Sequence, residues 1–283
     1  MSPAAAACTV SVLVRAALEG PPRPARVLAV ARQALYLLPH GAPAPLALVV
    51  PGAVRVPAAV VLPPAAGERP FAGLAPGAVG RIGGGRIAVG SLCLTAGGFW
   101  APPRAQDTPP GPALTRLAAL RPPRPLPAEL RPAAGALLRA LADGAPSAQL
   151  RTALGVLSLG PGATPSGDDL LCGLLLAGHL AHRAPQWLGV LTGVVRQHAA
   201  DRTPPVSAAL LGHAVDGHCV PQAAALLRAA ATGADLAVPV TDLLAVGHSS
   251  GNDLLHGLCA GARLTTRAPA AGPGPFSLRS TPS

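Results

Sequence analysis

The stretch "LGPGATPSGDDLLCGLLLAG", residues 159–178, decides the fold of the C-terminal part of this chain. A loop of Gly, Pro, Ser and Thr leads into two adjacent carboxylates and then into an apolar run. Its residues 166–174, S-G-D-D-L-L-C-G-L, return as S-G-N-D-L-L-H-G-L at 250–258, with seven of nine positions identical across 84 residues. Serine followed three residues later by an acidic residue, just before an apolar run, is the signature of a helix start. The sequence therefore predicts two helices that begin in the same way.

Two interpretations of the repeat stay open. In the first, Ser166 with Asp169 and Ser250 with Asp253 form capping boxes and nothing more. In the second, the repeat builds a binding site, because a helix N-terminus with free amides attracts anions. Carboxylates beside such an end can accept a proton, hold an NH₂ group or bind a cation. If both copies build one site, the two helix starts should face each other across a shared cleft.

The binding interpretation defines a set of candidate site residues. The candidate catalytic residues are Asp168, Asp169, Asp253 and His248. The candidate substrate contacts are Gly160, Gly162, Thr164, Ser166, Gly167, Ser207, Ser249, Ser250, Gly251 and Asn252. Asp168 has no part in the capping pair, so Asp168→Ala is expected to leave the melting temperature almost unchanged and to abolish function.

The histidines outside the repeat predict no metal site. His179 and His182 share an expected helix, and His213 and His218 flank Asp216, but none of these spacings matches a zinc motif. Satisfied or surface histidines are the better interpretation. The sequence identifies no cofactor.

Working outward from the repeat, the chain predicts an α+β protein. Residues 1–105 contain short apolar runs broken by Pro and Gly, typical of a small β-barrel or sandwich, with a hairpin turn at Gly83–Gly85. Residues 106–131 are Pro-rich and predict a linker. Residues 132–267 have helical periodicity and carry both copies of the motif, and residues 268–283 predict a disordered tail.

Composition excludes several classes of protein. Hydrophobic residues make up 50% of the 283 residues but aromatics only 2%, so platforms for stacking nucleic-acid bases are nearly excluded. The net charge of +10 comes from scattered arginines, which argues against a nucleic-acid partner. Five cysteines without a C-x-x-C pair favour reduced thiols. With no basic signal segment, and prolines throughout the charge-free run 33–54, we expect a cytoplasmic protein with no membrane contact.

The motif residues also carry a resemblance. T-P-S-G-D-D at 164–169, G-H-S-S-G at 247–251 and the pair Thr203 and Ser207 resemble the domain-of-unknown-function family that includes the AllH subunit of oxamate carbamoyltransferase. "APAPLALVV" and "GGGRIAVG…FWAPP" in the N-terminal part are similar more loosely. Ala163 and Leu170 stand where the family pattern has bulkier residues, which affects packing more than chemistry.

The resemblance implies a subunit of an enzyme that converts oxalurate and phosphate to oxamate and carbamoyl phosphate, in purine-nitrogen recovery through allantoin. It implies other subunits as partners and a small anionic substrate at the helix starts. The aspartates would accept from the carbamoyl NH₂, Ser166 or Ser250 would donate to the oxalurate carboxylate, and His248 would move a proton. A non-catalytic subunit that binds a metabolite or assists assembly is the alternative.

Overall fold

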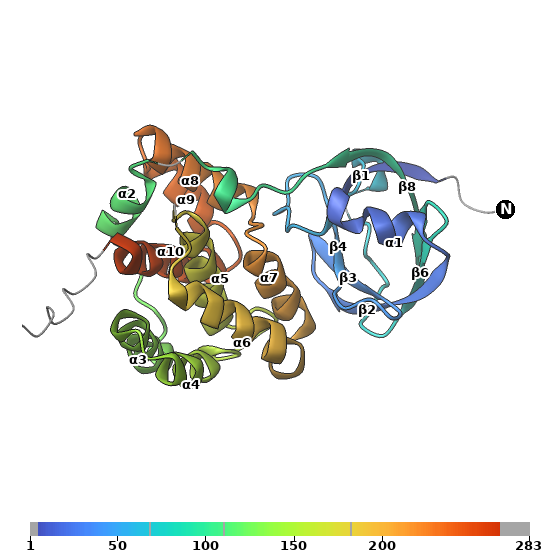
Figure 1. The fold of residues 1–283 in the computed structure, drawn as a ribbon. Helices are drawn as coiled ribbons and strands as arrows, with labels where there is room; N and C mark the ends of the chain where they lie inside the picture. Colours follow the sequence, from blue (N-terminus) through green and yellow to red (C-terminus); the bar gives the residue numbers. More distant parts are fainter. Residues whose placement is uncertain (1–4, 68, 110, 182, 267–283) are drawn as a thin grey trace, which may run out of the picture.

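The structure is a computed structural model that describes residues 5–67, 69–109, 111–181 and 183–266. It has a β-barrel in the N-terminal part and a group of helices in the C-terminal part, side by side (Figure 1). This arrangement confirms the α+β class, and of the two predicted β architectures it is the barrel that is present. Within the described residues, no helix is both long and apolar enough to cross a membrane.

The barrel closes in the order β1-β5-β4-β3-β2-β6-β7-β8. Neighbouring strands are antiparallel, except that β1 pairs in parallel with β8 and β4 pairs in parallel with β5. The strands are β1 (Ala6–Ser11), β2 (Arg23–Val30), β3 (Ala34–Pro39), β4 (Leu46–Val49), β5 (Ala59–Val61), β6 (Val79–Gly83), β7 (Arg86–Val89) and β8 (Leu92–Trp100). The short helices η1 (Val12–Val14), α1 (Arg15–Glu19) and η2 (Pro64–Ala66) belong to the same part of the chain.

Alternation along the strands places aliphatic side chains inside the barrel. In β3 every second side chain is buried, and Leu35 and Leu37 are fully enclosed with Val10, Ile82 and Ile87. The predicted glycine turn is a two-residue hairpin between β6 and β7, in which Gly84 and Gly85 have φ of +59° and +77°. Two consecutive positive φ angles define the hairpin turn that best matches strand twist, and glycine adopts them without strain.

The helices follow the barrel in the chain and form the larger core. They are α2 (Ala113–Ala119), α3 (Leu130–Asp143), α4 (Pro146–Val156), α5 (Ser166–His179), α6 (Gln186–Arg202), α7 (Pro205–Val215), α8 (Pro221–Thr232), α9 (Ala237–Leu244) and α10 (Ser250–Thr266), preceded by η3 (Ala105–Asp107). Helix α5 is buried along nearly its whole length and contacts α10, α7 and α6. It is therefore the central helix of this part (Figure 1).

The segment predicted as a linker, 106–131, is partly integrated into the helical core. Ala113 and Leu117 of α2 are buried there, and the Arg116 guanidinium donates to the carbonyls of Ala229 at 2.9 Å and Ala234 at 2.7 Å. Arg263 of α10 donates to Ala118 O at 2.9 Å. The domain boundaries themselves stay a prediction, and the predicted tail at 268–283 lies outside the described residues.

Helix α9 is an element that sequence analysis did not identify. Pro239 interrupts its apolar run and argues against a helix. In the structure Pro239 is the third residue of α9, where its missing N–H has no intrahelical partner to lose. The proline therefore sits in the one turn of a helix that tolerates it.

Candidate functional site

The repeated motif places two helix starts side by side, because α5 and α10 cross at a pair of glycines. A Cβ atom on Gly173 would collide with the carbonyl of Leu254, and one on Gly257 would collide with the carbonyl of Leu170. Only residues without a side chain allow the two backbones to approach this closely. The crossing lies one to two turns from the start of each helix, so both starts are brought together.

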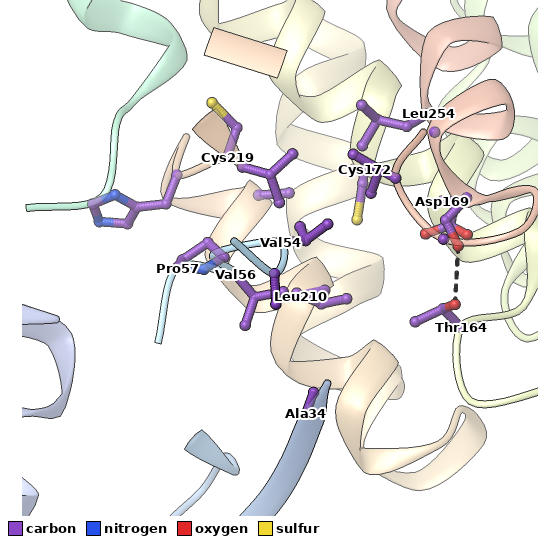
Figure 2. Close-up of a pocket in the computed structure, with 18 of the residues that line it drawn as sticks. Ala34, Val54, Val56, Pro57, Thr164, Asp169, Cys172, Leu210, Cys219 and Leu254 are labelled. Carbon is purple, nitrogen blue, oxygen red and sulfur yellow. Dashed lines mark hydrogen bonds between the residues drawn. The ribbon is translucent and has the colours of Figure 1, made fainter. Parts of the chain in front are cut away.

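The contact between the two starts is direct. Thr164 Oγ1, in the loop before α5, lies 3.1 Å from Ser250 Oγ, the first residue of α10 (Figure 2). Both residues line the same pocket as Asp169 and Gly251. The expectation that the two motif copies meet at one cleft is confirmed.

Each copy of the motif is joined to its preceding loop in the same way. The Gly167 amide donates to Leu159 O at 2.9 Å, and the Gly251 amide donates to Val246 O at 2.9 Å. These glycines also allow the end of the preceding helix to pass close by, since a Cβ on either would collide with the carbonyl of Val156 or Leu243. The matched contacts support an internal repeat of a helix, a loop and a second helix.

The capping-box interpretation is wrong for the first copy. The N-cap of α5 is Pro165, and no side chain makes a capping hydrogen bond there. Ser166 is already the first helical residue, one position too late to cap. The amides of Gly167 and Asp168 bond instead to the carbonyls of Leu159 and Pro165, so they are not free for an anion either.

Asp168 is a buried structural carboxylate and does not line the pocket. It is 1% exposed, and its Oδ1 accepts from the Ser158 amide at 2.7 Å. Its Oδ2 accepts from the hydroxyls of Thr203 and Ser207, the latter at 2.6 Å. The three donors come from the loop after α4, the end of α6 and the start of α7. Asp168 therefore holds three segments together, which accounts for the conspicuous Thr203 and Ser207.

Asp169 has the opposite environment and lines the pocket. Its side chain is 6% exposed, and its Oδ2 is buried with no hydrogen-bond partner in the structure. The pKa of Asp169 is raised to about 7, chiefly by burial; a hydrogen bond from Ser250 opposes the rise, and the carboxylates of Asp253 and Asp168 add to it. At neutral pH this carboxyl exists in both protonation states, which suits a group that holds or transfers a proton.

On α10, Asn252 and Asp253 are buried and are not among the pocket-lining residues. Asn252 Nδ2 is 3.5 Å from Asp253 Oδ1, while Asn252 Oδ1 and Asp253 Oδ2 have no partner in the structure. His248 is exposed and does not line the pocket. These residues belong to the motif that the sequence predicts as a site, but in the structure they do not line the cavity.

The remaining candidates divide into loop and wall residues. Thr164, Asp169, Ser250 and Gly251 line the pocket, whereas Gly160, Gly162, Ser166, Gly167, Asp168, Ser207, Ser249, Asn252, Asp253 and His248 do not. Gly160 and Gly162 have positive φ angles of +118° and +93° and shape the loop that presents Thr164. The predicted roles of all these residues stay predictions.

The pocket lies between the barrel and the helices and has a volume of about 310 Å³. Thr164 and Asp169 lie at one end, and Cys219 and Pro57 at the other, with Val54, Val56, Leu210 and Cys172 between them (Figure 2). The barrel wall of the pocket is formed by Ala31, Gln33, Ala34, Tyr36, Ala53, Val54, Val56 and Pro57. This wall has no signal in the sequence, because most of its residues are small and apolar and come from β3 and from the β2–β3 and β4–β5 loops.

The pocket-lining set also includes His218, which the sequence placed among satisfied histidines. Burial lowers the pKa of His218, and the nearby Arg104 lowers it further. Its Nδ1 is buried without a partner in the structure. Among the described residues, His, Cys, Asp and Glu form no group of three or more that could hold a metal ion.

Fold and site together define an α+β protein with a largely apolar pocket between a barrel and a helical core, at the meeting point of an internal repeat. Residues 156–262 match the family model described as oxamate carbamoyltransferase subunit AllH. The match confirms the predicted resemblance for the segment that contains both motif copies. No curated protein and no solved structure matches the chain.

Proposed function

We propose that this chain is a subunit of an oxamate carbamoyltransferase-like enzyme, which converts oxalurate and phosphate to oxamate and carbamoyl phosphate. The observation that carries the proposal is the meeting of Thr164, Asp169 and Ser250 at one end of the pocket, within the segment that matches the family model. A small anionic substrate would bind there, between the starts of α5 and α10. Free cysteines are consistent with a reducing cytoplasm as its location.

The reaction divides into steps that these side chains can assist. A phosphate oxygen attacks the carbamoyl carbon, the carbon–nitrogen bond to the oxamate nitrogen breaks, and that nitrogen takes up the proton released by phosphate. Asp169, with its pKa near 7, can accept from the carbamoyl NH₂ and can pass the proton to the leaving nitrogen. The hydroxyl of Thr164 can donate to the oxyanion that forms on the carbamoyl oxygen, while the hydroxyl of Ser250 donates to Asp169.

The charge of the pocket supports a role for partner subunits. Oxalurate and phosphate are both anions, while Asp169 has the carboxylates of Asp168 and Asp253 close by. None of the described residues that line the pocket is an arginine. An anion binds in a desolvated site only when a cation or several N–H donors compensate its charge. We therefore propose that other carbamoyltransferase subunits supply the positive charge and complete the site.

A second candidate function belongs to a different class. In it, the chain is a non-catalytic subunit that binds a metabolite or assists assembly. The apolar lining of most of the pocket favours this alternative, because it is better suited to binding than to phosphate chemistry.

The test is carbamoyl phosphate formation from oxalurate and phosphate, measured for the chain alone and for its complex with co-expressed partner subunits. We expect little or no product from the chain alone and turnover by the complex. Asp169→Asn in the complex should lower the rate by about 10²–10⁴-fold, the range for loss of a proton-transfer group. Asp201→Asn, an exposed carboxylate on α6, is the matched control.

Each outcome decides a separate part of the proposal. Full activity of the chain alone would contradict the need for partners. If the complex does not turn over oxalurate, the second candidate function remains, in which the chain is a non-catalytic subunit that binds a metabolite or assists assembly. Wild-type rates for Asp169→Asn would exclude Asp169 as the proton-transfer group.

A further inference from the structure

The pocket is larger and more apolar than a small anion requires. Beyond its polar end, the walls consist mostly of aliphatic side chains and thiols from both parts of the molecule (Figure 2), with Gln33, Tyr36 and His218 as the polar or aromatic members. The barrel contributes Ala34, Val54, Val56 and Pro57, and the helices contribute Cys172, Leu210, Val220 and Leu254. Oxalurate is polar at every position and would leave these walls in contact with water. A ligand that matches the pocket has a hydrocarbon part several carbons long.

The polar end has an unpaired hydrogen-bond acceptor. Asp169 Oδ2 is buried and unpartnered in the structure, Asp169 lines this end, and the carboxylates of Asp168 and Asp253 lie close to it. Unpaired buried acceptors are costly, so a ligand that donates hydrogen bonds is favoured at this end. A carboxylate or phosphate head would add a further negative charge next to these aspartates and is disfavoured.

A ureido or carbamoyl group fits both requirements. Its NH₂ donates toward Asp169, and its carbonyl oxygen accepts from the hydroxyl of Thr164, whose neighbour Ser250, 3.1 Å away, donates to Asp169. It is uncharged, so it loses less hydration on entering an apolar cavity than an ammonium group does.

We propose that the pocket binds carbamoyl compounds with an aliphatic body, their NH₂ end at Asp169 and their hydrocarbon part between Val54, Val56 and Leu210. This inference rests on the proposed function, since it assigns the same end of the pocket to the carbamoyl group. It adds that the carbamoyl compound recognised by this chain is not restricted to oxalurate. The aliphatic walls set a preference for carbamoyl compounds that carry a hydrocarbon chain.

Binding of alkylureas to the purified full chain tests the proposal by calorimetry. The series is urea, ethylurea and butylurea, with pentanoate as a probe that has the same butyl chain and an anionic head. Each buried CH₂ should strengthen binding about fourfold, so butylurea should bind at least tenfold more tightly than ethylurea. Pentanoate should bind more weakly than butylurea at pH 8. Equal affinities of ethylurea and butylurea, or tighter binding of pentanoate, would overturn the proposal.

Two variants show whether the increase in affinity with alkyl chain length arises in this pocket. Val54→Phe fills the space for the alkyl chain from the β4–β5 loop, and Ala34→Leu fills it from β3. Val79→Phe, on a side chain that is 73% exposed on β6, is the matched control. We expect either pocket variant to remove the dependence of affinity on chain length, and Val79→Phe to retain it. Retention of the dependence in both pocket variants, with melting temperatures near that of the wild type, would exclude this pocket.

Failure of this inference differs from failure of the proposed function. A complex that turns over oxalurate while the chain shows no gain with alkyl length contradicts only the aliphatic preference. A gain with alkyl length together with an inactive complex contradicts only the transferase reaction.

Discussion

Asp168 and Asp169 are neighbours in the sequence with opposite surroundings. Successive residues of a helix point about 100° apart, so one carboxylate faces the junction of α6 and α7 while the other faces the pocket. Asp168 has three donors for its two oxygens, whereas Asp169 Oδ2 has none in the structure. The oxygens of Asp168 are therefore occupied by hydrogen bonds within the protein, whereas Asp169 has an acceptor oxygen without a partner.

Asp168→Ala should therefore destabilise the protein, contrary to the expectation from sequence. Removing the carboxylate leaves the Ser158 amide and the hydroxyls of Thr203 and Ser207 without their buried acceptor. Each stranded buried donor costs about 1–3 kcal/mol, so the total loss should be at least about 3 kcal/mol. Urea unfolding measures the loss in free energy of unfolding. Asp201→Ala, an exposed carboxylate, should change it by less than about 0.5 kcal/mol; a similar small effect of Asp168→Ala would disprove the structural role.

At the scale of elements, the crossing of α5 and α10 positions the site. The crossing depends on Gly173 and Gly257, whose Cα atoms face each other across the two helices. The leucines that follow each Asp, Leu170, Leu171 and Leu255, are buried around this contact. The separation of the two helix starts therefore depends on the absence of two side chains.

Gly173→Ala should separate these helices. The new methyl group would collide with the backbone of α10 at Leu254, which cannot move aside as a side chain can. We expect a loss of at least about 1–3 kcal/mol in the free energy of unfolding, the usual cost of overpacking a core. Gly189→Ala is the control, since nothing lies within 4 Å of a Cβ there and the exposed position on α6 should gain about 0.5–1 kcal/mol from helix propensity. Equal effects of the two substitutions in thermal unfolding would contradict a tight crossing.

At the scale of the whole molecule, the barrel and the helices meet across a partly apolar interface. The outer face of β4 and β5, with Ala47, Val49, Ala59 and Val61 buried, forms a small cluster separate from the barrel interior. A second, smaller pocket between this face and α7 is lined by Tyr36, Ala47 and His213, among others. Backbone bonds from Ala105 N to Gly217 O at 2.8 Å and from Cys219 N to Pro103 O at 3.0 Å join the segment after β8 to the α7–α8 turn.

Asp169 on α5 and His213 on α7 have opposite effects on how the stability of the fold depends on pH. Burial, aided by His218 and opposed by Asp216, lowers the pKa of His213 from 6.5 to about 4, so the unfolded chain binds the extra proton between these values and stability falls as pH falls. The pKa of Asp169 is raised from 3.8 to about 7, so the folded chain binds the extra proton and stability falls as pH rises through that range. Between about pH 4 and 6.5 the two contributions nearly cancel.

Single substitutions should reveal how each of the two groups changes the free energy of unfolding with pH. Asp169→Asn leaves the His213 contribution, so its free energy of unfolding should fall, relative to wild type, as pH falls from 6.5 to 4. His213→Asn leaves the Asp169 contribution, so its free energy of unfolding should fall, relative to wild type, as pH rises from 4 to 6.5. Each slope can reach about 1.4 kcal/mol per pH unit, and the double variant should return to the wild-type profile. Denaturant unfolding at pH 4.5, 5.5 and 6.5 measures all four proteins, and parallel profiles would contradict both assignments.

The sequence by itself determined the α+β class, the glycine hairpin at 83–85, most helices and the repeated motif, because local periodicity and turn chemistry encode these features. It offered the meeting of the two motif copies only as one of two interpretations, and the structure brings them together at Gly173 and Gly257. Tertiary structure alone decided the closure order of the barrel, which rests on pairings between distant strands. It also decided which aspartate faces the pocket and which residues form the opposite wall. Burial and long-range hydrogen bonds set these, and neither appears in a local pattern of residues.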